Sequence, residues 1–208
     1  MLGAVALSHV GDNALLGEWA DELLAGAVEQ SFAFWRAPGT IYRGWVKAKN
    51  GDVAEGLSLM RSGSAAYRAA GAELWMPHHI ALLARACALA QQTKEALALF
   101  DDALQIVERT GERWLVAELY RHKGEMLLRQ GHSAVAEELY RTALNIAEEQ
   151  EAKLWELRAA VSLVRLRCDQ RVDAEAQDLL GRVYGWFTEG FDTPDLREAK
   201  ALLQMLDG

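Results

Sequence analysis

The stretch WLVAELYRHKGEMLLRQGHSAVAEELYRTALNIAEEQ, residues 114–150, contains one complete repeating unit of this chain. Its second half spaces the apolar residues Leu139, Ala143 and Ile146 three or four positions apart, which gives an α-helix one buried face. Another helical pattern ends just before it, at Gln130-Gly131, where glycine can adopt the left-handed conformation that closes a helix. The stretch therefore predicts a helical hairpin.

This hairpin pattern recurs about every 40 residues along the chain. Tryptophan, turn residues and small residues all repeat with this period. The tryptophans that follow this period are Trp35, Trp75, Trp114 and Trp155, and we interpret them as packing anchors. A fixed period of this length with two helices per unit is typical of a helical solenoid.

We therefore expect an all-α fold, a right-handed solenoid of helical hairpins with a C-terminal capping helix. In each hairpin the first helix is called helix A and the second helix B. The expected A helices are 35–49, 75–90, 114–130 and 154–169, and the expected B helices are 52–70, 93–110, 133–150 and 173–187. Residues 1–9 and 12–30 predict the stub of an A helix and a lone B helix, and Thr193-Pro194-Asp195 has the residue types of a last helix start.

The predicted domain organisation is a single solenoid over residues 1–208. Its expected parts are a partial first repeat at 1–30, repeats at 31–71, 72–111, 112–152 and 153–190, and the capping helix within 191–208. Because the chain opens inside a hairpin, we expect a fragment of a longer protein.

Composition and charge exclude several classes of protein. Hydrophobic residues make up 51% of the chain and charged residues 25%, which is typical of a folded chain. No window approaches 18 uncharged apolar residues, so no membrane span is predicted. The net charge of −8 argues against nucleic-acid and anionic-membrane partners. Two cysteines and the lack of a secretory signal predict a cytoplasmic protein.

Small and aromatic residues in the repeats follow the spacing of a known family. Gly124, Ala136, Tyr140 and Ala143 lie at the eighth, twentieth, twenty-fourth and twenty-seventh places of the tetratricopeptide (TPR) pattern. The closing segment, YGWFTEGFDTPDL at 184–196, resembles the C-terminal TPR-like region of large bacterial predicted ATPases. Many of those carry an adenylate or guanylate cyclase domain, and others a DNA-binding activator domain. The resemblance implies a regulatory or partner-binding arm.

The search for catalytic motifs finds none, so we expect no enzyme activity and no cofactor. The chain lacks a phosphate-binding Gly-Lys-Ser/Thr loop, a dinucleotide fingerprint and a nucleophile elbow. Glu118, His122 and Glu125 share one helical face and could form a weak metal site, but we interpret them as an exposed charged face, and no metal is predicted. His78-His79 is interpreted as a solvated first helical turn, and Cys87 as a small buried hydrophobe.

Two functions remain open. The first is a module for protein–protein interaction in bacterial signalling, which binds an acidic protein or peptide, or neighbouring domains of the parent chain. The second is a sensor that binds a small anionic effector in the same groove and regulates an attached ATPase or cyclase. An open channel would favour a peptide and a closed pocket an effector. The sequence does not indicate the oligomeric state.

The binding groove is expected on the concave face, which the A helices line. Arginine suits recognition of carboxylates and phosphates there, and Trp45 would add a flat apolar contact. Reversing the charge of both Arg121 and Arg165 should then abolish binding without changing the melting temperature. The predicted groove residues are Trp45, Lys49, His78, Arg85, Arg121, Glu125, Arg129, Arg158 and Arg165.

Overall fold

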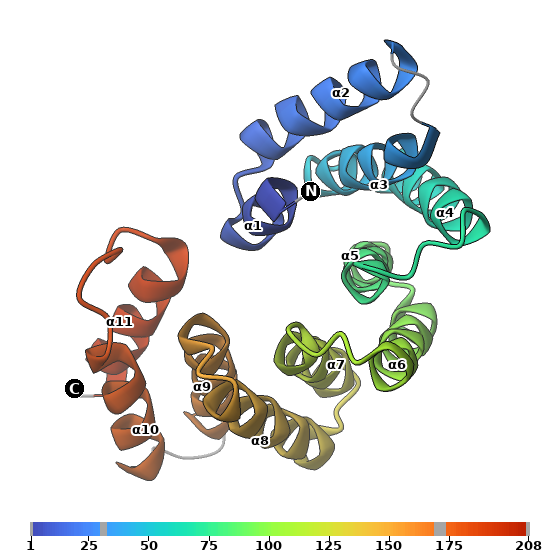
Figure 1. Ribbon diagram of the computed structural model, residues 1–208. Coiled ribbons are helices and arrows are strands. Elements are labelled where there is room, and N and C mark those ends of the chain that lie inside the picture. Colours follow the sequence, from blue (N-terminus) through green and yellow to red (C-terminus); the bar gives the residue numbers. More distant parts are fainter. Residues whose placement is uncertain (1, 30–32, 169–173, 207–208) are drawn as a thin grey trace. The chain divides into compact units, whose positions relative to one another are not determined.

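The computed structural model describes residues 2–29, 33–168 and 174–206, and within them it is built of helices with no strand (Figure 1). The helices are α1 (Leu2–Val10), α2 (Asn13–Glu29), α3 (Ala33–Lys49), α4 (Val53–Ala69), α5 (Met76–Leu89), α6 (Thr93–Thr110), α7 (Val116–Arg129), α8 (Ser133–Glu149), α9 (Lys153–Cys168), α10 (Ala174–Gly185) and α11 (Pro194–Leu206). The all-α expectation is confirmed, and the expected helix ends that fall on described residues lie within two residues of these bounds. The expected ends at residues 1, 30, 169 and 173 lie outside the described residues.

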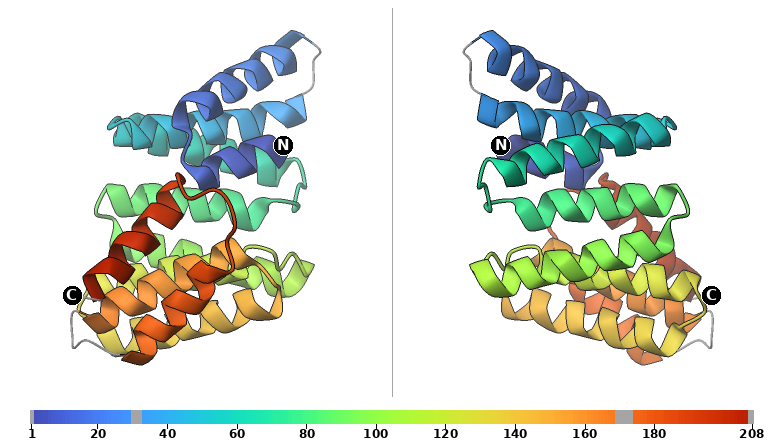
Figure 2. Two further views of the ribbon diagram at one scale, coloured as in Figure 1. Left: turned by 90° about the vertical axis from the view of Figure 1, so that its left-hand side faces the viewer. Right: turned by 90° about the vertical axis from the view of Figure 1, so that its right-hand side faces the viewer.

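The chain divides into two compact units. The first is Met1–Glu112 and contains α1 to α6, and the second is Arg113–Gly208 and contains α7 to α11. Within each unit, consecutive helices pack against each other as hairpins. In both views of Figure 2, α3 and α4 run side by side in the first unit.

Glycine permits the closest helix approach of the first unit, between α3 and α4. A Cβ atom added at Gly44 would come within 2.7 Å of the backbone oxygen of Gly56, and one added at Gly56 within 2.6 Å of the backbone oxygen of Gly44. Backbone atoms cannot move aside as a flexible side chain can. The small residues of the repeat therefore mark positions where two helix backbones meet.

Gly56→Ala should destabilise the protein by about 1–3 kcal/mol, because the added methyl group forces α3 and α4 apart. Gly26→Ala is the matched control: its Cβ atom would meet nothing within 4 Å. Alanine is the better helix former, so this variant should gain up to about 1 kcal/mol. Urea unfolding of both variants measures the difference, and similar free energies of unfolding would contradict the close contact.

Ion pairs join the two B helices α4 and α6. Arg61 on α4 bonds Glu95 on α6 at 2.9 Å, and Arg68 bonds Asp102 two turns further along. The four side chains are 38–50% exposed, so each pair contributes no more than about 1 kcal/mol. They link the two B helices at matching positions along their lengths.

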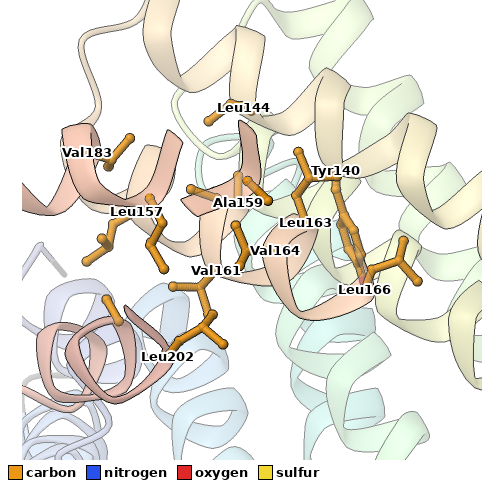
Figure 3. Close-up of a cluster of buried hydrophobic side chains, with 14 of the residues drawn as sticks. Tyr140, Leu144, Leu157, Ala159, Val161, Leu163, Val164, Leu166, Val183 and Leu202 are labelled. Atoms are coloured by element: carbon orange, nitrogen blue, oxygen red, sulfur yellow. The ribbon is translucent and has the colours of Figure 1, made fainter. Parts of the chain in front are cut away.

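The core of the second unit surrounds α9. Tyr140 of α8 packs on Gly124 of α7, where an added Cβ atom would lie 2.6 Å from the tyrosine ring. Helix α9 contacts α8, α10 and α11, and its buried residues lie at the centre of the cluster in Figure 3. Helix α11 closes the cluster with the buried residues Leu196, Ala199 and Leu202, and it exposes Arg197, Lys200 and Gln204.

Across the described residues, no helix combines the length and the apolar character needed to cross a membrane.

Candidate functional site

Three of the predicted groove residues meet in the first unit. The guanidinium carbon of Arg85 on α5 lies 4.6 Å from the centre of the Trp45 ring on α3, and the Lys49 ammonium lies 5.7 Å from it. A cation this close to an indole ring is held by the ring's negative face. The stack therefore fixes the position of Arg85 at the surface of the A helices.

Trp45 itself is not a surface contact in this structure. Its side chain is 2% exposed, and its indole Nε1 is buried without a hydrogen-bond partner among the described residues. The sequence places it at a concave position, but the long side chains of Lys49 and Arg85 cover its ring. A partner would therefore meet the cations and not the ring.

The solvated first turn expected at His78-His79 is wrong, because both side chains are buried. The imidazole of His79 packs edge-on against Tyr67, 4.9 Å between ring centres, and against Tyr42, at 5.6 Å. The Nε2 of His78 lies 3.4 Å from the Ser8 hydroxyl on α1. Helices α1, α3 and α4 enclose the start of α5, which the sequence of α5 alone does not reveal. Burial lowers the pKa of His79 to about 3 and that of His78 well below its usual value.

A buried charge network occupies the A helices of the second unit. The Arg121 guanidinium donates to both carboxylate oxygens of Glu118, at 2.5 and 3.0 Å, and it also bonds Glu125. Arg158 on α9 approaches the same Glu118 carboxylate at 3.3 Å. Glu118 is almost completely buried and Arg121 nearly so. The network therefore ties α7 to α9 inside the unit.

The exposed charged face expected for Glu118, His122 and Glu125 is thus wrong. His122 is buried as well, and its Nδ1 lies 2.8 Å from Glu125. The acids are engaged by arginine, and no group of three His, Cys, Asp or Glu side chains in the described part of the chain is placed to hold a metal. The spacing that resembled a metal site belongs to an internal ion network.

Arginine keeps these carboxylates charged. Burial alone would raise the pKa of Glu118, but the Arg121 guanidinium outweighs it and holds that pKa well below its usual value. The same balance of burial against Arg121, aided by His122, lowers the pKa of Glu125 to about 2. Charge reversal at Arg121 would place a third negative charge beside the carboxylates of Glu118 and Glu125. The sequence predicted that charge reversal at Arg121 and Arg165 would leave the melting temperature unchanged. This variant therefore cannot serve as the test of binding, because the change at Arg121 would destabilise the protein.

Two arginines of α9 pair with acids of the last helix, α11, whereas Arg167 bonds Glu137 of α8. Arg158 forms a two-pronged ion pair with Asp195 on α11, with both N···O distances 2.7 Å, and Arg165 pairs with Glu198. The spacing of about 40 residues between Glu118 and Arg158 is the signal that sequence reasoning missed. Residues one repeat apart are neighbours in adjacent A helices, and opposite charges there predict an ion pair.

The nine predicted residues therefore fall into three groups. Lys49, Arg129 and Arg165 are exposed; Arg85, Glu125 and Arg158 are partly buried; Trp45, His78 and Arg121 are buried. Asp169, which the repeat pattern also predicts on the concave face of the A helices, lies outside the described residues.

The burial predicted for Cys87 is confirmed, whereas the periodic tryptophans are only partly buried. Cys87 is buried as expected, and burial raises the pKa of its thiol to about 11. The periodic tryptophans lie at the starts of the A helices and stay partly exposed, Trp35 most clearly. The backbone N–H of Trp75 donates to the Glu112 carboxylate at 2.9 Å. Their period marks where each A helix begins more than it marks the core.

A match to a known protein family covers the helices from α5 to α8. Residues 77–149 match the tetratricopeptide repeat family. The helical hairpins, the small residues at their contacts and this match agree on a TPR-like solenoid fold.

Solved structures support the TPR-like fold over a larger part of the chain. BtubC (BKLC) from P. vanneervenii superposes with a TM-score of 0.67 at 16% identity, covering 95% of this chain and 88% of that one. A Rap protein complexed with Competence and Sporulation Factor gives a TM-score of 0.68 at 14% identity, covering 98% of this chain and 61% of that one. At such identities the likeness concerns the fold alone.

A curated relative is similar in sequence. An uncharacterized protein of Rhizobium meliloti (strain 1021) is 30% identical over 128 residues, which cover 61% of this chain. The match spans 12% of that relative's length.

Proposed function

We propose that this chain is a non-catalytic, cytoplasmic helical-repeat module that binds an acidic protein partner, within a larger bacterial signalling protein. TPR-like folds generally serve protein–protein interaction, because stacked hairpins expose an extended surface. A Rap protein of this fold was solved with Competence and Sporulation Factor bound. The relative of which this chain matches a small part supports a place in a longer protein.

The observation that carries the proposal is the exposure of cations on the A helices. Lys49 ends α3, Arg129 ends α7, and Arg165 lies in the last turn of α9; all three reach solvent in a chain of net charge −8. Lys49 and Arg129 can bond the carboxylates of a partner, and Arg165 can do so once it is released from Glu198. In the first unit Arg85, fixed on Trp45 beside Lys49, adds a further cation to the A helices.

The double variant Lys49→Glu/Arg129→Glu should weaken partner binding by about tenfold or more, because charge reversal at exposed cations opposes an acidic partner. The melting temperature should fall only slightly, since losing a cation from the last turn of a helix costs about 0.3–1 kcal/mol at each site. A photo-crosslinking amino acid at either position first identifies the partner in cells. Its affinity for the purified chain is then measured by titration calorimetry.

Lys94→Glu/Lys200→Glu is the matched control, since it makes the same change of charge on α6 and on the outer face of α11, where both lysines are exposed. This control should bind like the parent chain. Equal weakening in both double variants would show a general charge effect and contradict a site on the A helices.

A further inference from the structure

Helix α11 places two acids on the arginines of α9. The carboxylate of Asp195 bonds the Nε and Nη2 of Arg158, each at 2.7 Å, and Glu198 pairs with Arg165. Residues three apart lie on one face of a helix, and residues seven apart lie two turns along it. The two helices therefore meet through two matched charge pairs.

The first pair is largely shielded from water. The side chain of Arg158 is 14% exposed and that of Asp195 is 20% exposed. A bidentate arginine–carboxylate bond in such a place is strong and directional, and with a neutral side chain at position 195 Arg158 would keep only the longer contact with Glu118, at 3.3 Å. This position therefore selects an acid.

Apolar residues of α11 complete the contact. Leu196, Ala199 and Leu202 are buried against the cluster that α9 and α10 form. The two acids lie beside this apolar stripe along α11. Asp195 directly precedes Leu196, and Glu198 directly precedes Ala199. The surface of α9 and α10 thus recognises an amphipathic helix that carries acids on one edge.

The second pair is open to solvent. Arg165 is 58% exposed and Glu198 is 38% exposed. A groove of about 370 Å³ runs beside them between α9 and α11, lined by Arg165, Cys168, Glu198, Ala201, Leu202 and Met205. An incoming acid can therefore reach Arg165 while α11 is still held at Arg158.

We propose that α11 is the internal occupant of a helix-binding site on α9 and α10, and that an acidic amphipathic helix of a partner protein binds there by displacing α11. The charge complementarity and the sequence of α11 itself define the partner: two acids three residues apart beside an apolar stripe. Because Arg158 and Arg165 are among the residues expected to bind an acidic partner, this inference rests on the proposed function and names the partner's chemistry.

The test uses the full chain and a fluorescein-labelled peptide with the sequence of residues 191–206. In the parent chain α11 competes at the high effective concentration of a tethered segment, so the peptide should bind weakly. Chains with Asp195→Asn/Glu198→Gln, or with Leu202→Ala, loosen α11 and leave Arg158 and Arg165 intact. Each should bind the peptide about tenfold or more tightly than the parent chain does in fluorescence anisotropy.

Two controls decide the chemistry. A chain with Arg197→Gln/Lys200→Gln, changed on the exposed face of α11, should bind the peptide as weakly as the parent. A peptide carrying Asn and Gln in place of the two acids should lose about tenfold in affinity for the loosened chains. The proposal is overturned if parent and loosened chains bind the peptide equally, or if the neutral peptide binds as well as the acidic one.

Two further outcomes also count. Dimerisation of the loosened chains without peptide would give the site to a second copy of this chain and overturn the partner assignment. If the partner found by crosslinking at Lys49 binds normally while the peptide experiment fails, only this inference is lost and the proposed function stands.

Discussion

Arg121→Met should lower the free energy of unfolding by about 3–5 kcal/mol, because it leaves the buried carboxylate of Glu118 and the partly buried one of Glu125 without their shared cation. Glu118 and Glu125 are both bonded by this guanidinium, and Glu118 is almost completely buried. Methionine keeps much of the side-chain volume, so the loss reports charge and not packing. Urea unfolding followed by circular dichroism measures it.

Arg141→Met is the matched control for this substitution. Arg141 bonds Glu137 one turn earlier on α8 at 2.9 Å, but its side chain is 53% exposed, and Arg167 also bonds Glu137. An exposed pair contributes about 1 kcal/mol or less, so this variant should stay close to the parent. Equal losses for the two variants would contradict the view that burial makes the network of α7 critical.

Acid should destabilise the first unit before carboxylates begin to protonate. The pKa of His79 falls from about 6.5 in an unfolded chain to about 3 in the folded one, and that of His78 is lowered too. Below pH 6.5 the unfolded state therefore binds more protons than the folded state does. Each histidine therefore lowers the free energy of unfolding by about 1.4 kcal/mol for every unit by which the pH falls in this range. For His79 alone this is about 2 kcal/mol between pH 6.5 and 5.

Glu118 and Glu125 also make the protein less stable as the pH falls, but they do so at a lower pH than the histidines. Because their pKa values lie below the usual one in the folded chain, Glu118 and Glu125 contribute stability that is lost only as the pH falls below about 4.5. Between pH 6.5 and 5, the histidines should therefore dominate.

The pH effect is measured as free energy of unfolding at pH 7.5 and pH 5. His79→Phe should reduce the difference between the two pH values by about 2 kcal/mol, since its ring can pack on Tyr42 and Tyr67 without binding a proton. His132→Gln, at an exposed site, serves as the control. An unchanged pH dependence in His79→Phe would contradict a buried neutral imidazole.

The helices and their hairpin contacts were predictable because they depend on patterns that recur with the repeat of about 40 residues. Apolar spacing locates each helix, and turn residues such as Gly131 end it. Small residues mark close approach, as Gly44 and Gly56 do between α3 and α4. A residue such as Gly124 can be placed in its repeat because the period is regular.

The burial of charges on the A helices could not be predicted in the same way. Glu118, Arg121 and His122 have the spacing of a solvated helix face, and that spacing is identical whether the face meets water or a neighbouring helix. The decisive neighbour, Arg158, comes one repeat later on α9. Likewise His79 is enclosed by aromatic residues from α3 and α4, which lie well before it in the chain.

The ion pairs between α4 and α6 restrict how this chain could grow by duplication of its repeats. A tandem copy of residues 72–111 would place Asp101 and Glu108, one period after Arg61 and Arg68, opposite copies of Glu95 and Asp102. Acid would then face acid at both positions, and like charges repel. The repeats are therefore not equivalent at this surface: in a lengthened chain, repulsive contacts would stand at the new junction where α4 and α6 have ion pairs, each worth no more than about 1 kcal/mol, unless the charges at that junction were changed as well.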